Sequence, residues 1–280
     1  MSRQVPLTSR FRRTLCLVLL LFVLTSVAQS GKAQGLKFSQ AGSYPTGGKT
    51  LVTGDFNGDG NIDLVANNGN TAIALLLGKG NGSFQTPVTF SVGTGPAGIV
   101  AGDFNHDGKL DLATANGDGT ISVLLGNGDG TFQPAVNYAA SNNPTSIVAA
   151  DFNRDGHLDL AVTNSKYQNS MVSVLLGVGN GTFRAAVSYA INDSEAAPTM
   201  LATGDLNGDG KADLVTANGG GSNYITVFLG NGDGTFRTPI NTSGAAQPRT
   251  LALWDFNRDG KLDVAVLNAF AVIMFGNGDG

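Results

Sequence analysis

Residues 151–159 read Asp-Phe-Asn-Arg-Asp-Gly-His-Leu-Asp, and the pattern Asp-x-Asn-x-Asp-Gly-x-x-Asp within this stretch occurs five times in a chain of 280 residues. From one copy to the next, the first aspartates are 48, 48, 54 and 50 residues apart. A nearly constant period of this length indicates a repeat protein, in which each repeat forms one supersecondary unit. The five copies, called loops 1 to 5 below, are residues 55–63, 103–111, 151–159, 205–213 and 255–263.

Oxygen-bearing side chains stand at positions one, three, five and nine of every loop, and glycine stands at position six. Ca²⁺ takes about 6–8 oxygen ligands in a flexible shell, and alternate side chains of a tight loop supply several of them. Position seven varies between Asn, Lys and His, so we expect it to contribute only its backbone carbonyl. Glycine at position six permits the positive φ that bends a loop around an ion. The sequence therefore predicts up to five Ca²⁺ sites, whose ligand residues are Asp55, Asn57, Asp59, Asn61, Asp63, Asp103, Asn105, Asp107, Lys109, Asp111, Asp151, Asn153, Asp155, His157, Asp159, Asp205, Asn207, Asp209, Lys211, Asp213, Asp255, Asn257, Asp259, Lys261 and Asp263.

The distribution of acidic residues favours a metal site over ordinary turns. Three aspartates in each of five loops account for 15 of the 21 acidic residues, and Glu195 is the one glutamate. Three carboxylates in one tight loop repel each other unless a cation lies between them. The alternative is a set of Asp-Gly hairpin turns whose acids are solvated. An EF-hand is not expected, because position twelve is never the Glu that an EF-hand requires and the flanks are short apolar, strand-like runs.

Each repeat contains four short apolar segments separated by turn residues. In the second repeat these segments are residues 99–102, 112–115, 121–125 and 132–139, with loop 2 between the first and the second. Four such segments indicate a four-stranded antiparallel sheet, which cannot bury both of its faces alone. Sheets arranged radially cover each other's faces, so we expect an all-β fold, a β-propeller of four-stranded antiparallel blades with five repeats visible. A linear β-solenoid is the alternative.

The repeats resemble a known family. In the second repeat, residues 95–98 (Gly-Pro-Ala-Gly), an apolar strand, loop 2 and then residues 124–126 (Leu-Leu-Gly) are similar to the FG-GAP repeat of the integrin α-subunit propeller and of many secreted bacterial proteins. The resemblance covers roughly residues 36–280 and implies that the nine-residue loop joins the first two strands of a blade and holds Ca²⁺. Seven blades are usual for that family. Five visible loops therefore imply either a fragment of a seven-bladed ring or a five-bladed ring closed by residues 38–44, which resemble a fourth strand.

Residues 1–30 are predicted to be a signal peptide. A basic start with four arginines precedes an apolar run over residues 15–27, which is too short for an ordinary membrane span, and small residues follow. A retained membrane anchor is the alternative. Cleavage leaves a propeller domain of residues 31–280 without cysteine, and the loss of four of the 17 basic residues brings the net charge to −8. We expect a secreted, extracellular or cell-surface protein with no later membrane span and no nucleic-acid partner.

The sequence offers no obvious catalytic site. Its two histidines, His106 and His157, occupy positions four and seven of different loops, so we predict no His pair for zinc and no Ser-His-Asp set. Most carboxylates are accounted for as calcium ligands, which leaves few for acid–base catalysis. We therefore expect a calcium-binding adhesion module and not an enzyme, with a protein or a glycan as its ligand. The alternatives are the propeller domain of a polysaccharide-degrading enzyme and a structural spacer of a larger surface protein.

The ligand is expected on the face where the repeats differ. In a four-stranded antiparallel blade, the first and third connections lie on one face, and the second connections lie on the other together with the blade-to-blade connections. Residues 164–170 and 218–224 lengthen second connections, and residues 191–197 lengthen a blade-to-blade connection. Loops on a rigid scaffold commonly carry binding, so Tyr167 and Tyr224 are predicted to contact the ligand.

Two further predictions concern large apolar residues at the loops. Trp254 directly precedes loop 5, and we expect it either to pack at the end of the propeller channel or to offer its indole face to a sugar. An apolar residue recurs at position two, and this recurrence predicts core packing for Phe56, Phe104, Phe152, Leu206 and Phe256.

Overall fold

The computed structural model describes residues 42–44, 46, 48, 50–166, 169–192, 195–244, 246–268 and 270–280, and the chain contains no helix within these ranges. The predicted signal peptide, residues 38–41 and Tyr167 lie outside the described residues. The chain divides into two compact units, Met1–Gln40 and Ala41–Gly280, and every sheet discussed below belongs to the second unit. A search of the described residues for a helix long and apolar enough to cross a membrane finds none.

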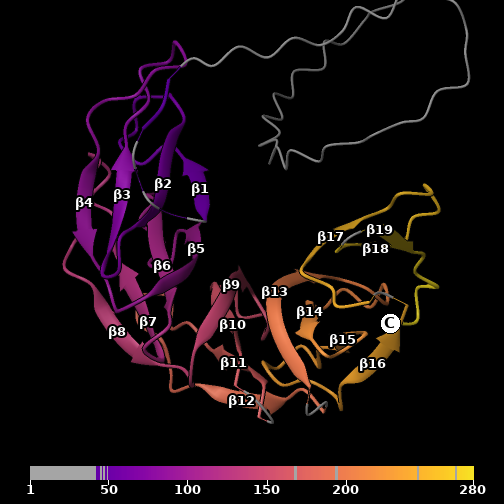
Figure 1. Ribbon diagram of the computed structural model, residues 1–280. Coiled ribbons are helices and arrows are strands. Elements are labelled where there is room, and N and C mark those ends of the chain that lie inside the picture. Colours follow the sequence, from indigo (N-terminus) through magenta and orange to yellow (C-terminus); the bar gives the residue numbers. More distant parts are fainter. Residues whose placement is uncertain are drawn as a thin grey trace, which may run out of the picture. The chain divides into compact units, whose positions relative to one another are not determined.

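Nineteen described strands form five antiparallel sheets, in which strands adjacent in the chain are paired (Figure 1). The first sheet comprises β1 (Leu51–Gly54), β2 (Asp63–Asn68), β3 (Ala72–Leu76) and β4 (Val88–Ser91). The second comprises β5 (Pro96–Gly102), β6 (Asp111–Asn116), β7 (Thr120–Leu124) and β8 (Val136–Ala139). The third comprises β9 (Pro144–Ala150), β10 (Asp159–Asn164), β11 (Met171–Leu175) and β12 (Val187–Ala190). The fourth comprises β13 (Ala196–Gly204), β14 (Asp213–Gly220), β15 (Tyr224–Phe228) and β16 (Ile240–Ser243). The fifth comprises β17 (Thr250–Trp254), β18 (Asp263–Leu267) and β19 (Ala271–Met274).

Each nine-residue loop closes the hairpin between the first and second strands of its sheet. The last residue of the first strand pairs with position nine of the loop, as Gly102 pairs with Asp111 and Ala150 pairs with Asp159. The loops therefore lie where the resemblance implied, and this prediction is confirmed.

The fourth strand of the second repeat starts later than predicted. The fourth strand of the second repeat was expected over residues 132–139, but β8 starts at Val136 and Phe132 forms only an isolated bridge with Gly126. The third repeat has the same gap between the Phe183 bridge and β12, with no proline in it, so the gap belongs to the repeat and does not depend on Pro134.

The prediction of a long second connection in the fourth repeat is wrong. Residues 218–224 were expected to form a connection, but β14 continues to Gly220, which stands opposite Ala196 of β13. The register shifts between Pro198 and Met200, and this irregularity lets the hairpin extend past a proline. The second connection is thereby shortened to residues 221–223.

The faces of the sheets are buried against neighbouring sheets. Every residue of β6 and of β10 is buried. One core cluster joins Ile121 and Val123 of the second sheet to Leu160 and Leu175 of the third, and similar clusters join the other consecutive sheets. The first strand of each sheet also contacts the first strand of the next. This radial stacking is that of propeller blades, so the predicted all-β propeller is confirmed.

Aromatic side chains join each blade to the next. Phe183 of the third sheet packs edge-on against Phe104 of loop 2 and against Tyr138 of β8, with ring centroids 5.6 Å apart in both pairs. The same arrangement joins the first sheet to the second and the third to the fourth. Tyr44 packs in this way on Phe84 of the first sheet, at 5.4 Å, where a preceding blade would place a fourth-strand aromatic residue. The described part of the strand predicted over residues 38–44, residues 42–44, forms no strand, and residues 38–41 lie outside the described residues.

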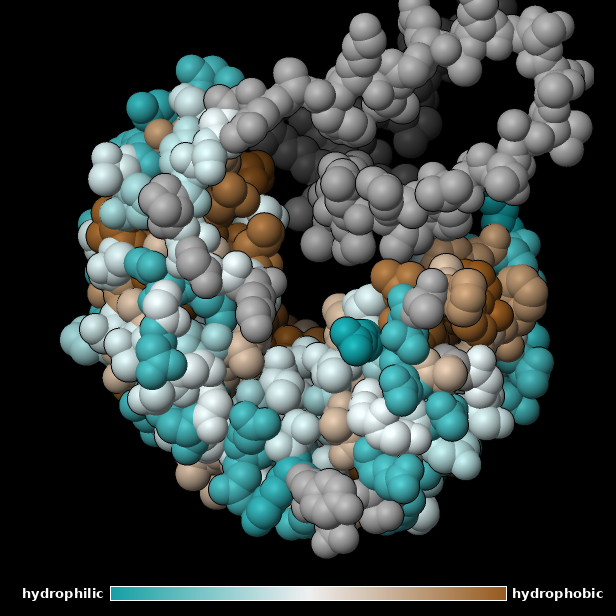
Figure 2. Space-filling model, viewed as in Figure 1, coloured by the Kyte–Doolittle hydropathy of each residue, from teal (hydrophilic) through white to brown (hydrophobic). Residues whose placement is uncertain are grey.

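The apolar residues at position two are buried in loops 1 to 4, as predicted, and Phe256 of loop 5 is half-buried. The fifth sheet also leaves large apolar side chains exposed, including Trp254 at 68% and Phe270 at 81%. Figure 2 shows hydrophobic residues gathered on the surface over this sheet. The packing prediction for Trp254 is therefore wrong for the described structure. Gly102, which precedes loop 2 as Trp254 precedes loop 5, lies against Leu158 of the next blade. Trp254 has no such neighbour, because no blade after the fifth is among the described residues.

Candidate metal centre

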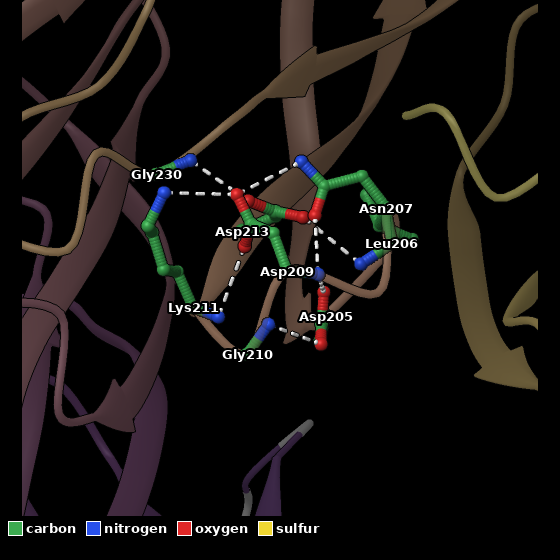
Figure 3. A network of polar contacts seen from close by, with 8 residues as sticks. All are labelled: Asp205, Leu206, Asn207, Asp209, Gly210, Lys211, Asp213 and Gly230. Atoms are coloured by element: carbon green, nitrogen blue, oxygen red, sulfur yellow. Dashed lines mark hydrogen bonds and ion pairs between the residues drawn. The ribbon is translucent and has the colours of Figure 1, made fainter.

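Loops 1 to 5 share one pattern of hydrogen bonds, which positions the side-chain oxygens of residues one, three and five. The carboxylate at position one accepts from the backbone N–H groups of positions five, at 3.1–3.2 Å, and six, at 2.8–2.9 Å. The amide oxygen at position three accepts from the N–H of position five at 2.8–3.1 Å. The carboxylate at position five accepts from the N–H of position seven, also at 2.8–3.1 Å. Figure 3 shows this arrangement in loop 4, where Asp205, Asn207 and Asp209 gather around one backbone turn.

Two residues in each loop adopt the left-handed backbone conformation. Position six is always glycine, with φ between 77° and 87°, as predicted. Position four is glycine in loops 1 and 4, but it is His106, Arg154 and Arg258 in the other loops, with φ of 60°, 62° and 64°. A residue with a Cβ atom is strained in this conformation by about 1–2 kcal/mol. Three loops therefore keep an exposed side chain at a position that glycine fills with less strain.

The aspartate at position nine is the buried base of each loop. All five of these residues have no exposed surface: Asp63, Asp111, Asp159, Asp213 and Asp263. One carboxylate oxygen accepts a hydrogen bond from the backbone N–H of position two, and the other accepts from a glycine N–H after the third strand, all at 2.7–2.9 Å. This residue therefore ties the loop to the end of the third strand.

The sequence analysis missed the glycines that complete this link. They end the recurrent motif after the third strand and are Gly78, Gly126, Gly177, Gly230 and Gly276. A Cβ atom on any of them would clash with the backbone carbonyl of position eight of the loop. The recurrence of glycine at this place in all five repeats was the signal that could have identified them.

The two kinds of aspartate also differ in acidity. Burial raises the pKa of Asp159 to about 6, and burial likewise raises the pKa of Asp111 and of Asp213. At position five, the backbone N–H of Asn61 lowers the pKa of Asp59, and a hydrogen bond from the Lys211 side chain lowers the pKa of Asp209. Proton binding is therefore favoured at Asp111, Asp159 and Asp213 in the base of their loops, and disfavoured at Asp59 and Asp209 on the exposed rim that position five forms.

A hairpin loop of this form, set between the first two strands of five stacked sheets, points to one repeat family. The FG-GAP-like repeat matches the chain over residues 55–114, 103–162, 157–216 and 205–266. The chain belongs to the FG-GAP-like repeat family. The resemblance found in the sequence is thus confirmed, while the secreted bacterial type remains a prediction.

Solved structures share the fold of this FG-GAP-like chain at low sequence identity. It is similar to BBS1N in a mercury-soaked crystal of its complex with ARL6DN, with a TM-score of 0.56, 17% identity, and coverage of 82% of this chain and 66% of that chain. A lead-soaked crystal of the same complex gives a TM-score of 0.54, 15% identity, and coverage of 84% and 68%. The chain thus spans about two thirds of the length of these solved chains, and the likeness shows the fold alone. A comparison with curated protein sequences gave no match.

The donor set of the FG-GAP-like loops fits Ca²⁺ in chemistry and in spacing. A carboxylate has about four acceptor sites, so one that accepts one or two backbone N–H groups can still bind a cation. Within the described ranges, however, no group of three or more His, Cys, Asp or Glu side chains is arranged to hold a metal ion. An ion would therefore have to draw the side chains of positions one, three and five toward itself. The position-seven carbonyl would join this ligand set, and the ion would offset the repulsion between the carboxylates. The position-nine aspartates were also predicted as ligands; their oxygens accept backbone N–H groups, and their part in metal binding remains a prediction.

Lysine side chains compete for the same carboxylates in two loops. Lys211 Nζ lies 3.0 Å from Asp209 Oδ2, and Lys109 Nζ lies 3.7 Å from Asp107 Oδ2. Exposed ion pairs of this kind add little to stability. They matter for metal affinity, because the ammonium group has to leave the carboxylate when a cation binds. Loop 1 has Asn61 at position seven, so we expect it to bind Ca²⁺ more tightly than loop 4 does.

The structure brings together the two histidines that the sequence analysis separated. His106 Nε2 lies 2.7 Å from His157 Nδ1, although 51 residues separate them. The expectation that the two histidines lie apart is therefore wrong, while the prediction that they form no zinc site is not tested by this contact. Position four of one loop faces position seven of the next across the boundary between blades, an offset of one repeat plus three residues that period counting alone does not reveal.

Backbone hydrogen bonds confirm the predicted division into two faces. Gly181, in the third connection of the third sheet, donates to Phe104 O of loop 2 at 2.9 Å. On the other face, Gly117 of a second connection donates to Gly95 O of a blade-to-blade connection at 2.8 Å. Tyr224 opens β15 at the latter face and is 38% exposed, so it is accessible to a ligand there.

Proposed function

We propose that this FG-GAP-like chain is a secreted propeller module that binds Ca²⁺ in its five loops and recognises a protein or a glycan on the face of the second connections. The observation that supports calcium binding is the fivefold repetition of one hydrogen-bonded loop whose free oxygens have the spacing of a calcium loop. The ligand role rests on the concentration of sequence differences at the opposite face.

Calcium binding is tested by titration calorimetry of protein that has been stripped with a chelator and dialysed. We expect several sites, up to five, and much weaker binding of Mg²⁺, because Mg²⁺ requires a smaller and more regular octahedral shell. Loop 1 is expected to fill before loop 4, which Asp59→Asn and Asp209→Asn variants would assign. Absence of any calcium heat up to about 1 mM, a concentration typical of extracellular modules, would rule out the proposal.

Ligand binding is tested with an array of glycans and purified surface proteins, followed by titration of any hit. We expect Tyr224→Ala to weaken binding without changing calcium affinity, and Val178→Ala in an exposed third connection on the opposite face to serve as the matched control. BBS1N, which shares the fold, was crystallised with a protein bound, and this precedent makes a protein ligand reasonable for the present chain. Loss of glycan binding in Trp254→Gly but not in Tyr224→Ala would instead move the site to the exposed indole before loop 5.

An enzymatic role is tested on the same protein by measuring the release of reducing ends from a panel of polysaccharides. The proposed binding role predicts no turnover at any calcium concentration. Turnover that disappears on substitution of a residue in this chain would replace the binding proposal with the enzyme alternative.

A further inference from the structure

Adjacent FG-GAP-like loops meet through position four of one loop and position seven of the next. At the boundary between the third and fourth blades, a Cβ atom added at Gly232 would lie 3.2 Å from Arg154 Cδ and 3.0 Å from Lys211 Cδ, so these two side chains flank one site. His106 and His157 occupy the same two positions at the boundary between the second and third blades. This boundary is therefore the one where both contributors are imidazoles.

We propose that His106 and His157 form a binding site for a divalent transition metal ion of the zinc, copper or nickel class, which links the second blade to the third. Imidazole nitrogen is a preferred ligand of these ions. Ca²⁺ prefers oxygen ligands and does not compete for this pair. The site is thus chemically separate from the calcium loops, although it lies on the same face.

The distance between the facing nitrogens suits two ligands of one ion after a small movement. The nitrogens are 2.7 Å apart, with ring centroids at 4.9 Å and ring planes inclined by 59°. Two nitrogens bound tetrahedrally at the usual zinc–nitrogen distance of about 2.0–2.1 Å stand about 3.3 Å apart. The rings would have to separate by roughly 0.6 Å to meet this geometry, and to turn so that both nitrogen lone pairs point at the ion and no longer at each other. His106 is exposed and at the tip of its loop, so its ring can make that movement without disturbing the core.

The backbone around both histidines is that of the other loops, so the repeat itself sets where the two rings lie. His106 adopts φ of 60°, close to the 62° and 64° of Arg154 and Arg258 at the same position. The ring of His157 lies against Gly179, where a Cβ atom would overlap it. One ring is therefore carried by a backbone conformation that the loops share, and the other is accommodated by a glycine of the adjacent turn.

Metal binding requires a change of tautomer and leaves coordination positions open. In the hydrogen-bonded pair one of the two facing nitrogens carries a proton. That proton moves to the other nitrogen of the same ring, so that both facing lone pairs are free and no proton is lost. Within the described residues, no third His, Cys, Asp or Glu side chain completes a metal group there. Water fills the remaining positions, as in metal sites that can exchange ligands.

The test uses the full chain without a polyhistidine tag, saturated with Ca²⁺, and titrated with Zn²⁺ in a calorimeter. We expect one Zn²⁺ site in the native protein. His106→Gly and His157→Asn should each weaken Zn²⁺ affinity at least tenfold, since the loss of an outer-shell partner already lowers metal affinity about 10–100-fold. Both substitutions install residues that other loops have at these positions, so folding and calcium affinity should be unchanged. Arg154→Gly is the matched control, because it removes a position-four side chain at the next boundary, and it should leave Zn²⁺ affinity unchanged.

A second readout identifies the ligands directly. Cu²⁺ bound to the native protein should show electron paramagnetic resonance coupling to two imidazole nitrogens, reduced to one or none in either histidine variant. The proposal is overturned if the native protein binds no Zn²⁺ up to about 1 mM, or if the variants bind Zn²⁺ and Cu²⁺ as the native protein does. In the first case the two histidines are a hydrogen-bonded pair and nothing more, and in the second the ions bind elsewhere.

Discussion

Positions five and nine of each loop are both aspartate, yet the base and the rim of the loop give them opposite environments. The base aspartate is fully buried and its two oxygens hold backbone N–H groups of two different segments, as Asp159 holds those of Phe152 and Gly177. The rim aspartate is exposed and its hydrogen bonds stay within the loop, as in Asp155. The repeated motif thus combines a structural tie, which works with or without an ion, and a set of oxygens that is available to one.

Removal of Ca²⁺ tests positions one, three and five of all loops together and should have the largest effect on the stability of the folded chain. With a Kd on the order of 10 μM and free calcium at about 1 mM, each site stabilises the folded chain by roughly 2.7 kcal/mol. The contributions of several sites add if the chain unfolds as one unit, so excess chelator should lower the melting temperature markedly. The measurement is a pair of calorimetric melts, with and without chelator, followed by recalcification. Coincident melts would mean that the rim aspartates are turn formers only.

Asp159→Ala tests the base of one loop. The substitution leaves two buried N–H groups without acceptors, and each such group costs about 1–3 kcal/mol, so unfolding should become easier by about 2–6 kcal/mol. Because this role does not involve an ion, the loss should be similar in chelator and in calcium, as measured by urea denaturation in both. Asp159→Asn keeps one acceptor oxygen, so its free energy of unfolding should fall by about half as much. A loss seen only in calcium would show that position nine acts as a ligand and not as a structural tie.

The sequence predicted the rim of the loop better than its base. Alternate oxygens and the glycine at position six are local, so loop shape and the hairpin followed from spacing alone. The second role of Asp159 depends on the N–H of Gly177, which is 18 residues away and reaches it only when the third strand folds back. Spacing within the motif therefore identified the residue without revealing what it holds.

Contacts between repeats were the least predictable from the sequence. His106 and His157 belong to different copies, and only the stacking of blades sets one opposite the other. The same holds for Trp254, whose exposure depends on whether another blade covers the fifth sheet. Extension of β14 to Gly220 was missed for a related reason, because pairing with β13 overrode local turn signals rich in glycine.

The raised pKa of Asp159 predicts that the base of the loop makes the stability of the chain depend on pH. Burial raises this pKa from 3.8 to about 6 in the folded chain, so the folded protein binds the proton more tightly than the unfolded chain does. The resulting stabilisation is fully present below about pH 4 and is lost as the pH rises through 6, a change of roughly 3 kcal/mol for this group. Carbon NMR of labelled aspartate carboxyls in chelated protein should place the Asp159 transition near pH 6. A midpoint near 4 would contradict the buried environment assigned to the base.

Asp155→Asn tests a single rim position and should have the smallest effect on stability. The substitution keeps an oxygen that can accept the N–H of His157, so in chelator the free energy of unfolding from urea denaturation should stay within about 0.5 kcal/mol of that of the native protein. In calcium it removes one negative charge from the ligand set, and a tenfold weaker site would make unfolding easier by about 1.4 kcal/mol. The diagnostic result is therefore a dependence on calcium that Asp159→Ala lacks: a loss of stability in calcium and none in chelator. Equal losses in both conditions would show that the rim aspartate is structural too, and the distinction between base and rim would no longer hold.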